Sequence, residues 1–78
     1  MDNKTFLKAL GQRIDALRKE KGLSFLELSY MSEIEKSNLV KLTSQGTNVT
    51  ALSLLKISKA LQIPLSVILD FDYGLEGN

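Results

Sequence analysis

The chain contains a succession of helix-starting and helix-ending residues separated by very short connections. In the first stretch, apolar residues recur at the spacings of an amphipathic α-helix; they are Phe6, Leu7, Leu10, Ile14 and Leu17. Asp2 or Asn3 can cap the start of this helix, and Gly22 ends it after the cationic Lys19 and Lys21. No stretch shows the alternation that is typical of a β-strand. The sequence therefore predicts helices throughout.

Two short helices are predicted next. Ser24 and Glu27 have the spacing of a capping box, in which the side chain of each residue bonds the backbone N–H of the other. This box opens a helix that runs to about Met31. After a break at 32–34, a third helix is expected over about 36–43. The pair is thus joined by a turn of roughly three residues, which is the arrangement of a helix-turn-helix.

The remaining chain predicts a polar loop at 44–48 and two further helices. Thr50 is a good N-cap for the fourth helix, and Pro64 is well placed at the entry to a short fifth helix at 65–69. One face of the fourth helix is expected to hold Ala51, Leu54, Leu55, Ser58 and Leu61, with Ile57 at its flank. The predicted fold class is all-α, a compact bundle of five short helices.

The length and the distribution of charge indicate one basic domain with an acidic tail. Residues 1–69 contain all ten Lys and Arg and six of the nine acids, so this predicted domain carries a charge of +4. Residues 70–78 contain Asp70, Asp72 and Glu76 and carry −3. We expect this tail to be flexible. A basic body of this kind is compatible with DNA contact on one face.

A second copy of the chain is the expected source of additional stability. A chain of this size buries only about 60% of the surface that it exposes when unfolded. It has no Cys and no His, which excludes disulfides and the usual zinc sites. Large apolar side chains near its end exceed what a short helix can cover, which favours a homodimer interface, although core packing within one subunit is the alternative. These residues are Leu65, Ile68, Leu69, Phe71 and Tyr73.

Several classes of protein are disfavoured by the sequence. The acids are scattered, and there is no His, no Cys and no glycine-rich phosphate loop, so we do not expect an enzyme. No run approaches the roughly 18 apolar residues of a membrane span, and the N-terminus has no signal-peptide pattern. We therefore expect a cytoplasmic protein without a cofactor, metal or small-molecule ligand.

An ordered set of residues between about Leu10 and Leu69 carries a family resemblance. The set consists of Arg13-Ile14, Leu17-Arg18, Gly22-Leu23-Ser24, Glu27-Leu28-Ser29, Ile34, Ser37, Leu39, Leu42, Asn48, Thr50 and Leu54-Leu55-Lys56-Ile57-Ser58-Lys59-Ala60-Leu61. In this order and at these spacings it resembles the phage-repressor/Cro-like helix-turn-helix family, which has the λ-repressor-like fold. The short length is similar to that of single-domain members, including the controller proteins of restriction–modification systems.

The resemblance implies a transcriptional regulator that binds double-stranded DNA, as a homodimer on a palindromic operator. In the family, the second helix of the motif enters the major groove. Carried over by position, the base-facing residues are Lys36, Ser37, Asn38 and Lys41. The implied phosphate contacts are Arg18, Ser24, Ser44, Gln45, Thr47 and Asn48. The alternative interpretation of the charged residues of the third helix is an ordinary solvated face.

Three positions depart from the family pattern. Phe25 stands where the family prefers Gln, and Gly46 is one position later than the usual loop glycine. Thr43 replaces a Glu that pairs with the arginine aligned to Arg18, so Arg18 can reach a phosphate, pair with another acid or lie exposed.

An alternative function is a protein-interaction module, such as an antitoxin or adaptor piece, with weak or no DNA binding. It is favoured by the near-zero net charge and by an unusually apolar second helix, with Phe25, Leu26, Tyr30 and Met31.

Overall fold

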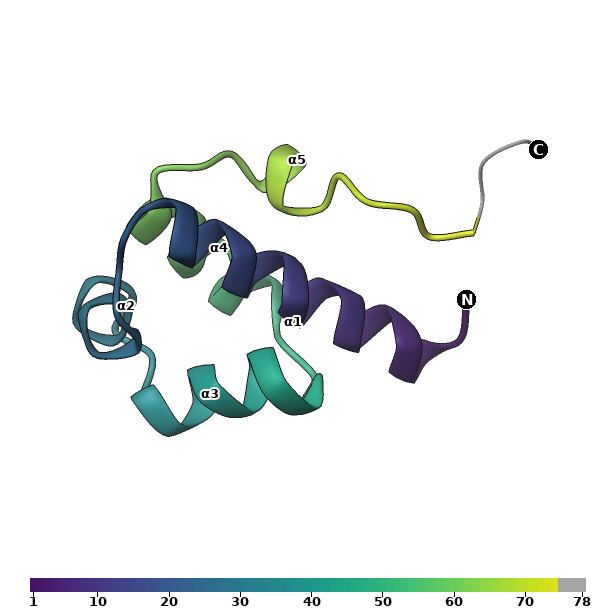
Figure 1. Ribbon diagram of the computed structural model, residues 1–78, viewed down its shortest axis with the longest axis horizontal. Coiled ribbons are helices and arrows are strands. Elements are labelled where there is room, and N and C mark those ends of the chain that lie inside the picture. Colours follow the sequence, from purple (N-terminus) through teal and green to yellow (C-terminus); the bar gives the residue numbers. More distant parts are fainter. Residues whose placement is uncertain (75–78) are drawn as a thin grey trace.

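The computed structural model describes residues 1–74, and these contain five helices and no strand. The helices are α1 (Asn3–Glu20), α2 (Phe25–Ser32), α3 (Lys36–Gln45), α4 (Ala51–Leu61) and α5 (Leu65–Ile68). Helices α3 and α5 pack on different sides of the long α1, and α2 packs against both α3 and α4 (Figure 1). The predicted all-α bundle of five helices is confirmed. Within the described residues, no helix is both long and apolar enough to cross a membrane.

The predicted starts of α1, α2 and α4 are confirmed by their capping bonds. Asp2 accepts a hydrogen bond of 2.7 Å from the backbone N–H three residues further along, and Thr50 does the same at 3.0 Å. Ser24 and Glu27 form the complete capping box. The end of α3 differs from the prediction, because the helix continues to Gln45 and its C-cap is Gly46. The first two residues of the predicted loop therefore belong to the last turn of α3.

Two glycines bring α3 and its C-terminal end into backbone contact with α1. A Cβ at Gly11 would overlap the carbonyl oxygen of Leu42, and a Cβ at Gly46 would lie 2.7 Å from the backbone nitrogen of Lys8. Gly46 also has a φ of +66°, which favours glycine. At these two points, α3 and its C-terminal end are consequently held so close to α1 that a side chain larger than glycine's hydrogen does not fit.

The core fills the space between the five helices. Its fully or nearly fully buried apolar residues are Leu10, Ile14, Leu17, Leu28, Leu39, Leu42, Ile57, Ala60, Leu61 and Ile68. The face predicted for α4 is partly wrong. Ile57, which was expected at the flank of this face, is fully buried, whereas Ala51 and Leu55 are exposed. The apolar residues of α4 outnumber the positions that its neighbours cover, so some of them remain at the surface.

The segment after α5 packs on the first turns of α1. The ring of Phe6 lies 5.7 Å from that of Phe71 and 5.6 Å from that of Tyr73, measured between centroids. An Nη2 of Arg13 donates a 2.9 Å hydrogen bond to the carbonyl oxygen of Val67, which links α5 to α1. The two aromatic residues thus contact the domain that was predicted to end at residue 69. The flexibility of the tail at 70–78 stays a prediction, and its residues 75–78 lie outside the described residues.

Candidate nucleic-acid interface

The outer face of α3 collects the residues predicted to face the bases. Leu39 and Leu42 anchor the helix in the core, with 0% and 5% of their surface exposed. The helical period then directs the remaining side chains outward. The predicted Lys36, Ser37, Asn38 and Lys41 are all exposed, and Val40, Ser44 and Gln45 are exposed beside them. The structure therefore brings the four predicted residues together on one polar, cationic surface, which we call the α3 face.

A groove continues the α3 face toward the loop that precedes α4. It has a volume of about 310 Å³, and Asn38 and Lys41 line it from the helix side. Thr47 and Asn48 line it from the loop side. Residues predicted to face bases and residues predicted to hold phosphates thus border one hollow, which is the juxtaposition that a helix-turn-helix interface requires.

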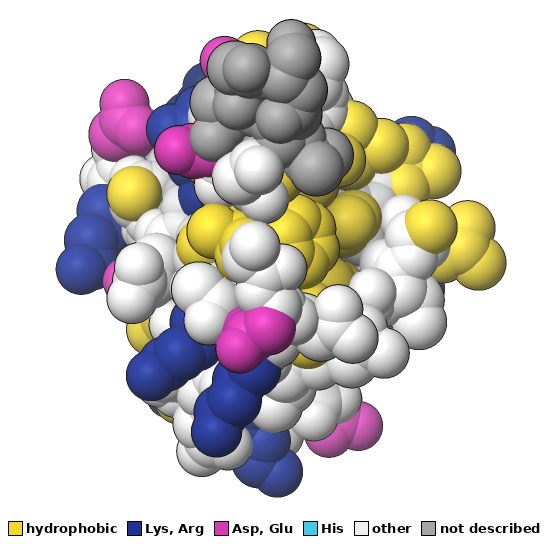
Figure 2. Space-filling model, turned by 90° about the vertical axis from the view of Figure 1, so that its right-hand side faces the viewer, with side chains coloured by type: hydrophobic (Ala, Val, Ile, Leu, Met, Phe, Trp, Pro, Cys, Tyr) yellow, Lys and Arg dark blue, Asp and Glu magenta, His cyan; other side chains and the backbone are white. Residues whose placement is uncertain are grey.

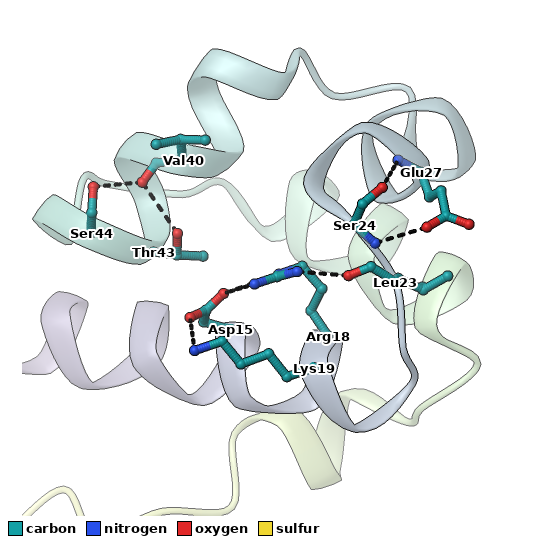
Figure 3. Close-up of polar contacts among 9 residues, drawn as sticks. All are labelled: Asp15, Arg18, Lys19, Leu23, Ser24, Glu27, Val40, Thr43 and Ser44. Atoms are coloured by element: carbon teal, nitrogen blue, oxygen red, sulfur yellow. Dashed lines mark hydrogen bonds and ion pairs between the residues drawn. The ribbon is translucent and has the colours of Figure 1, made fainter.

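Ser44 and Gln45, at the end of α3, differ in whether their side chains can donate a hydrogen bond to a phosphate. The Ser44 hydroxyl donates a 2.6 Å hydrogen bond to the carbonyl oxygen of Val40, and Thr43 donates to the same oxygen at 3.2 Å (Figure 3). A hydroxyl has one hydrogen, so Ser44 cannot donate to a phosphate while it keeps this bond. The exposed amide of Gln45 is better placed for that role.

The carboxylate of Glu27 already occupies the N-terminus of α2. The Glu27 carboxylate accepts a 2.9 Å hydrogen bond from the backbone N–H of Ser24, whose Oγ accepts from the N–H of Glu27 at 3.0 Å (Figure 3). The hydrogen bond from the Ser24 backbone lowers the pKa of Glu27, so this side chain is ionised at neutral pH. A phosphate at Ser24 would meet that negative charge, and we do not carry Ser24 forward as a phosphate contact.

Arg18 is committed to contacts inside the protein, which corrects its predicted phosphate role. Its Nε and Nη2 donate to Asp15 Oδ1 at 3.0 and 2.8 Å, and its Nη1 donates to the carbonyl oxygen of Leu23 at 2.6 Å (Figure 3). Its guanidinium carbon lies 4.0 Å from the centroid of the Phe25 ring. Only 12% of the side chain is exposed. Of the three alternatives left by the missing acid at position 43, pairing with another acid is the one observed.

The same contacts explain two departures from the family pattern. Asp15 supplies the carboxylate that Thr43 lacks, and the Phe25 ring covers the guanidinium in a cation–π contact where the family has a glutamine. Burial raises the pKa of Asp15, but the hydrogen bonds and charges of Arg18 and Lys19 outweigh it and hold this pKa below its usual value. The Asp15–Arg18–Phe25 cluster therefore fixes the start of α2.

Comparison with known proteins shows the family of this fold. Neither a protein-family model nor a curated protein matches the sequence. Among solved structures, the chain is 32% identical to the restriction–modification controller protein C.AhdI from Aeromonas hydrophila, with a TM-score of 0.76; the match covers 80% of this chain and 94% of that one. The chain belongs to the restriction–modification controller proteins.

A second structure gives the same family. The controller chain is 27% identical to a tyrosine-to-phenylalanine mutant of the restriction–modification controller protein C.Esp1396I, with a TM-score of 0.77. This match covers 81% of the controller chain and 84% of the mutant. The predicted resemblance to single-domain helix-turn-helix controllers is confirmed.

The predicted dimer residues of the controller chain occupy different environments. Ile68 has 0% of its surface exposed, so it has nothing to offer a partner, and its predicted interface role is wrong. Its side chain instead completes the core of its own subunit. The other four are half-buried; they are Leu65, Leu69, Phe71 and Tyr73.

Sequence reasoning missed Leu52 on α4, which is 71% exposed, and placed Leu55 on the buried face although it is 37% exposed. Val67 on α5, which belongs to the apolar set near the chain's end, is 39% exposed. Figure 2 shows hydrophobic side chains at the centre of one end of the molecule and more at the right-hand edge of that view. On α3, Val40 was also missed, although it is four residues from both Lys36 and Ser44 and that spacing places all three along one side of the helix.

Proposed function

We propose that this controller chain is a sequence-specific, DNA-binding transcriptional regulator that binds a palindromic operator as a homodimer. Each subunit lays α3 in the major groove of one half-site, with half-site centres about 34–36 Å apart. The observation that carries this proposal is the α3 face, an exposed polar surface on a helix anchored by Leu39 and Leu42 and continuous with the groove toward Asn48. Double-stranded DNA is the partner, and the cytoplasm is the expected location.

Each residue of the α3 face has a role that its chemistry supports. Lys36 and Lys41 can donate to guanine O6 and N7, while Ser37 and Asn38 can both donate and accept at base edges. The exposed methyl groups of Val40 suit contact with a thymine methyl. Uncharged donors border this surface and are assigned to the DNA backbone; they are Gln45, Thr47 and Asn48.

The homodimer is proposed from the apolar side chains that are exposed or half-buried on α4, on α5 and in the segment after α5. Helices α4 and α5 contact each other and expose Leu55 and Val67. Four of the predicted dimer residues lie near Val67 in sequence and are half-buried; they are Leu65, Leu69, Phe71 and Tyr73. Burying such surface against a second copy contributes about 25 cal/mol for each Å² removed from water. A symmetric dimer also matches a palindromic operator, because two identical α3 faces read two inverted half-sites.

Selection of bound duplexes from a random pool tests the proposal. We expect an enriched inverted repeat, and titrations of Lys41→Ala should show about a tenfold loss of affinity that is larger on the selected duplex than on a scrambled one. An equal loss on both duplexes would make Lys41 a phosphate contact. A pool that enriches no sequence would contradict sequence-specific binding.

A protein-interaction module is the second candidate, because α2 exposes large apolar side chains. Leu26, Met31 and Tyr30 are exposed by 49%, 52% and 76%. Retention on immobilised random DNA separates the two candidates. A protein that neutralises several phosphates weakens steeply as salt increases. Absence of retention at low salt would favour the interaction module.

A further inference from the structure

The first half of α1 lies directly beside the segment assigned to the DNA backbone. Gly46 ends α3, and a Cβ there would lie 2.7 Å from the backbone nitrogen of Lys8 and 2.8 Å from its Cα and Cγ. The aliphatic part of Lys8 therefore flanks Gly46, between the end of α3 and the loop at 47–48. Lys8 and Gly46 are far apart in the sequence, so no local sequence pattern predicts this contact.

The end of α3 lacks positive charge of its own. The C-terminus of a helix carries a partial negative charge, which repels phosphate, and the last turn of α3 contains no basic residue. Ser44 donates its hydroxyl hydrogen to the Val40 carbonyl oxygen, and Gln45, Thr47 and Asn48 are uncharged. A cation from another element would therefore strengthen a phosphate contact at the end of α3.

Lys8 is available for that purpose. Its side chain is exposed, and within residues 1–74 both ion pairs are made by Asp15, with Arg18 and Lys19. Lys4 lies one helical turn earlier on the same side of α1, although the nearby Asp2 carboxylate offsets part of its charge. Figure 2 shows basic side chains gathered at the lower left of its view.

We infer that Lys8 is a DNA-backbone contact, which extends the nucleic-acid surface from α3 onto α1. This inference rests on the proposed function. With α3 in the major groove, the Lys8 ammonium pairs with a phosphate that Gln45 or Asn48 also binds through an amide. Lys8 reads no base, so its contribution is the same for every DNA sequence.

The test compares Lys8→Gln with Lys8→Arg and with Lys59→Gln. Glutamine keeps most of the stem that packs on Gly46 but removes the charge. Lys59 is an exposed lysine on α4, a helix that contacts α2 and α5. Replacing it removes one positive charge outside the surface assigned to DNA, so Lys59→Gln is the matched control. Affinity is measured over a series of salt concentrations, on the selected operator and on an unrelated duplex, and the thermal midpoint of each variant verifies folding.

We expect Lys8→Gln to reduce the slope of log K against log salt by about 0.9 for each bound protomer. The affinity should fall by about fivefold per protomer at physiological salt, and by the same factor on both duplexes. Lys8→Arg and Lys59→Gln should keep the wild-type slope. If the wild type binds with a steep slope that Lys8→Gln leaves unchanged, the inference is wrong and the proposed function stands. If the wild type binds neither duplex, both are overturned.

Discussion

Two valines with nearly equal exposure lie in opposite surroundings. Val40 on α3 is 37% exposed and Val67 on α5 is 39% exposed. Val40 has Lys36 and Ser44 four residues before and after it, whereas Val67 has the apolar Ile63 and Phe71 at the same spacing. The comparison shows that the exposure of one side chain does not reveal what its surface binds. The neighbours do: isolated methyl groups in a cationic, polar surface suit a DNA groove, and methyl groups in an apolar surface suit a second protein.

Val40→Glu tests most strongly whether the α3 face around Val40 contacts DNA. The new carboxylate would lie in the DNA groove opposite phosphates, and such like-charge contacts cost several kcal/mol. We expect the affinity for the selected operator to fall by at least about 100-fold, or roughly 2.7 kcal/mol, in fluorescence-anisotropy titrations. The dissociation constant of the dimer should remain that of the wild type. Unchanged DNA affinity would remove α3 from the interface.

Val67→Glu makes the same substitution on the other surface. A buried charge at the dimer interface should raise the dimer dissociation constant by about 30-fold, the 2 kcal/mol that marks an important interface residue. Sedimentation equilibrium measures this change. Binding to a single half-site duplex should be preserved, because the α3 face is intact. A Val67→Glu protein that dimerises as well as Val40→Glu would place the interface elsewhere.

Gly46→Ala tests whether α3 is held against α1 by backbone contact. Gly22 is the matched control, since its φ of +69° is nearly the same but nothing lies within 4 Å of a Cβ there. Both alanines carry the strain of a left-handed conformation, and only the one at position 46 meets the Lys8 backbone. We expect Gly46→Ala to be the more destabilising by about 1–3 kcal/mol in urea unfolding. Equal losses would argue against this contact.

The smallest expected effect is a pH dependence that belongs to Asp15. Its folded-state pKa is lowered, so its contribution to stability is present above the unfolded-state pKa of about 3.9. That contribution is lost as the pH falls through the folded-state value. Asp15→Asn should therefore lower the thermal midpoint at pH 6 and converge on the wild type in strong acid. Parallel curves for the two proteins would contradict the proposed pairing of Asp15 with Arg18.

The starts of α1, α2 and α4 were predictable because they depend on local chemistry. Each N-cap needs only a short polar side chain and the N–H groups two or three residues further on, and Asp2, Ser24 and Thr50 meet this requirement. The outward placement of Lys36 and Lys41 followed in the same way from the helical period between Leu39 and Leu42.

The errors concern contacts between residues far apart in the sequence, or choices among several possible partners. The burial of Ile68 depends on packing between α5 and the other helices, and the closeness of Gly46 to Lys8 requires the whole α1–α3 arrangement. For Arg18, a partner at the favourable spacing of three residues was present in Asp15, but the family pattern drew attention to position 43 instead.

The most direct test of the central claim is a map of the residues whose backbone amide signals shift when the selected duplex is titrated into labelled protein. A DNA-binding α3 face predicts the largest NMR shifts over 36–48 and at Lys8, with little change at Leu26 and Tyr30 on α2. Shifts concentrated on α2, or no shifts at saturating duplex, would contradict it.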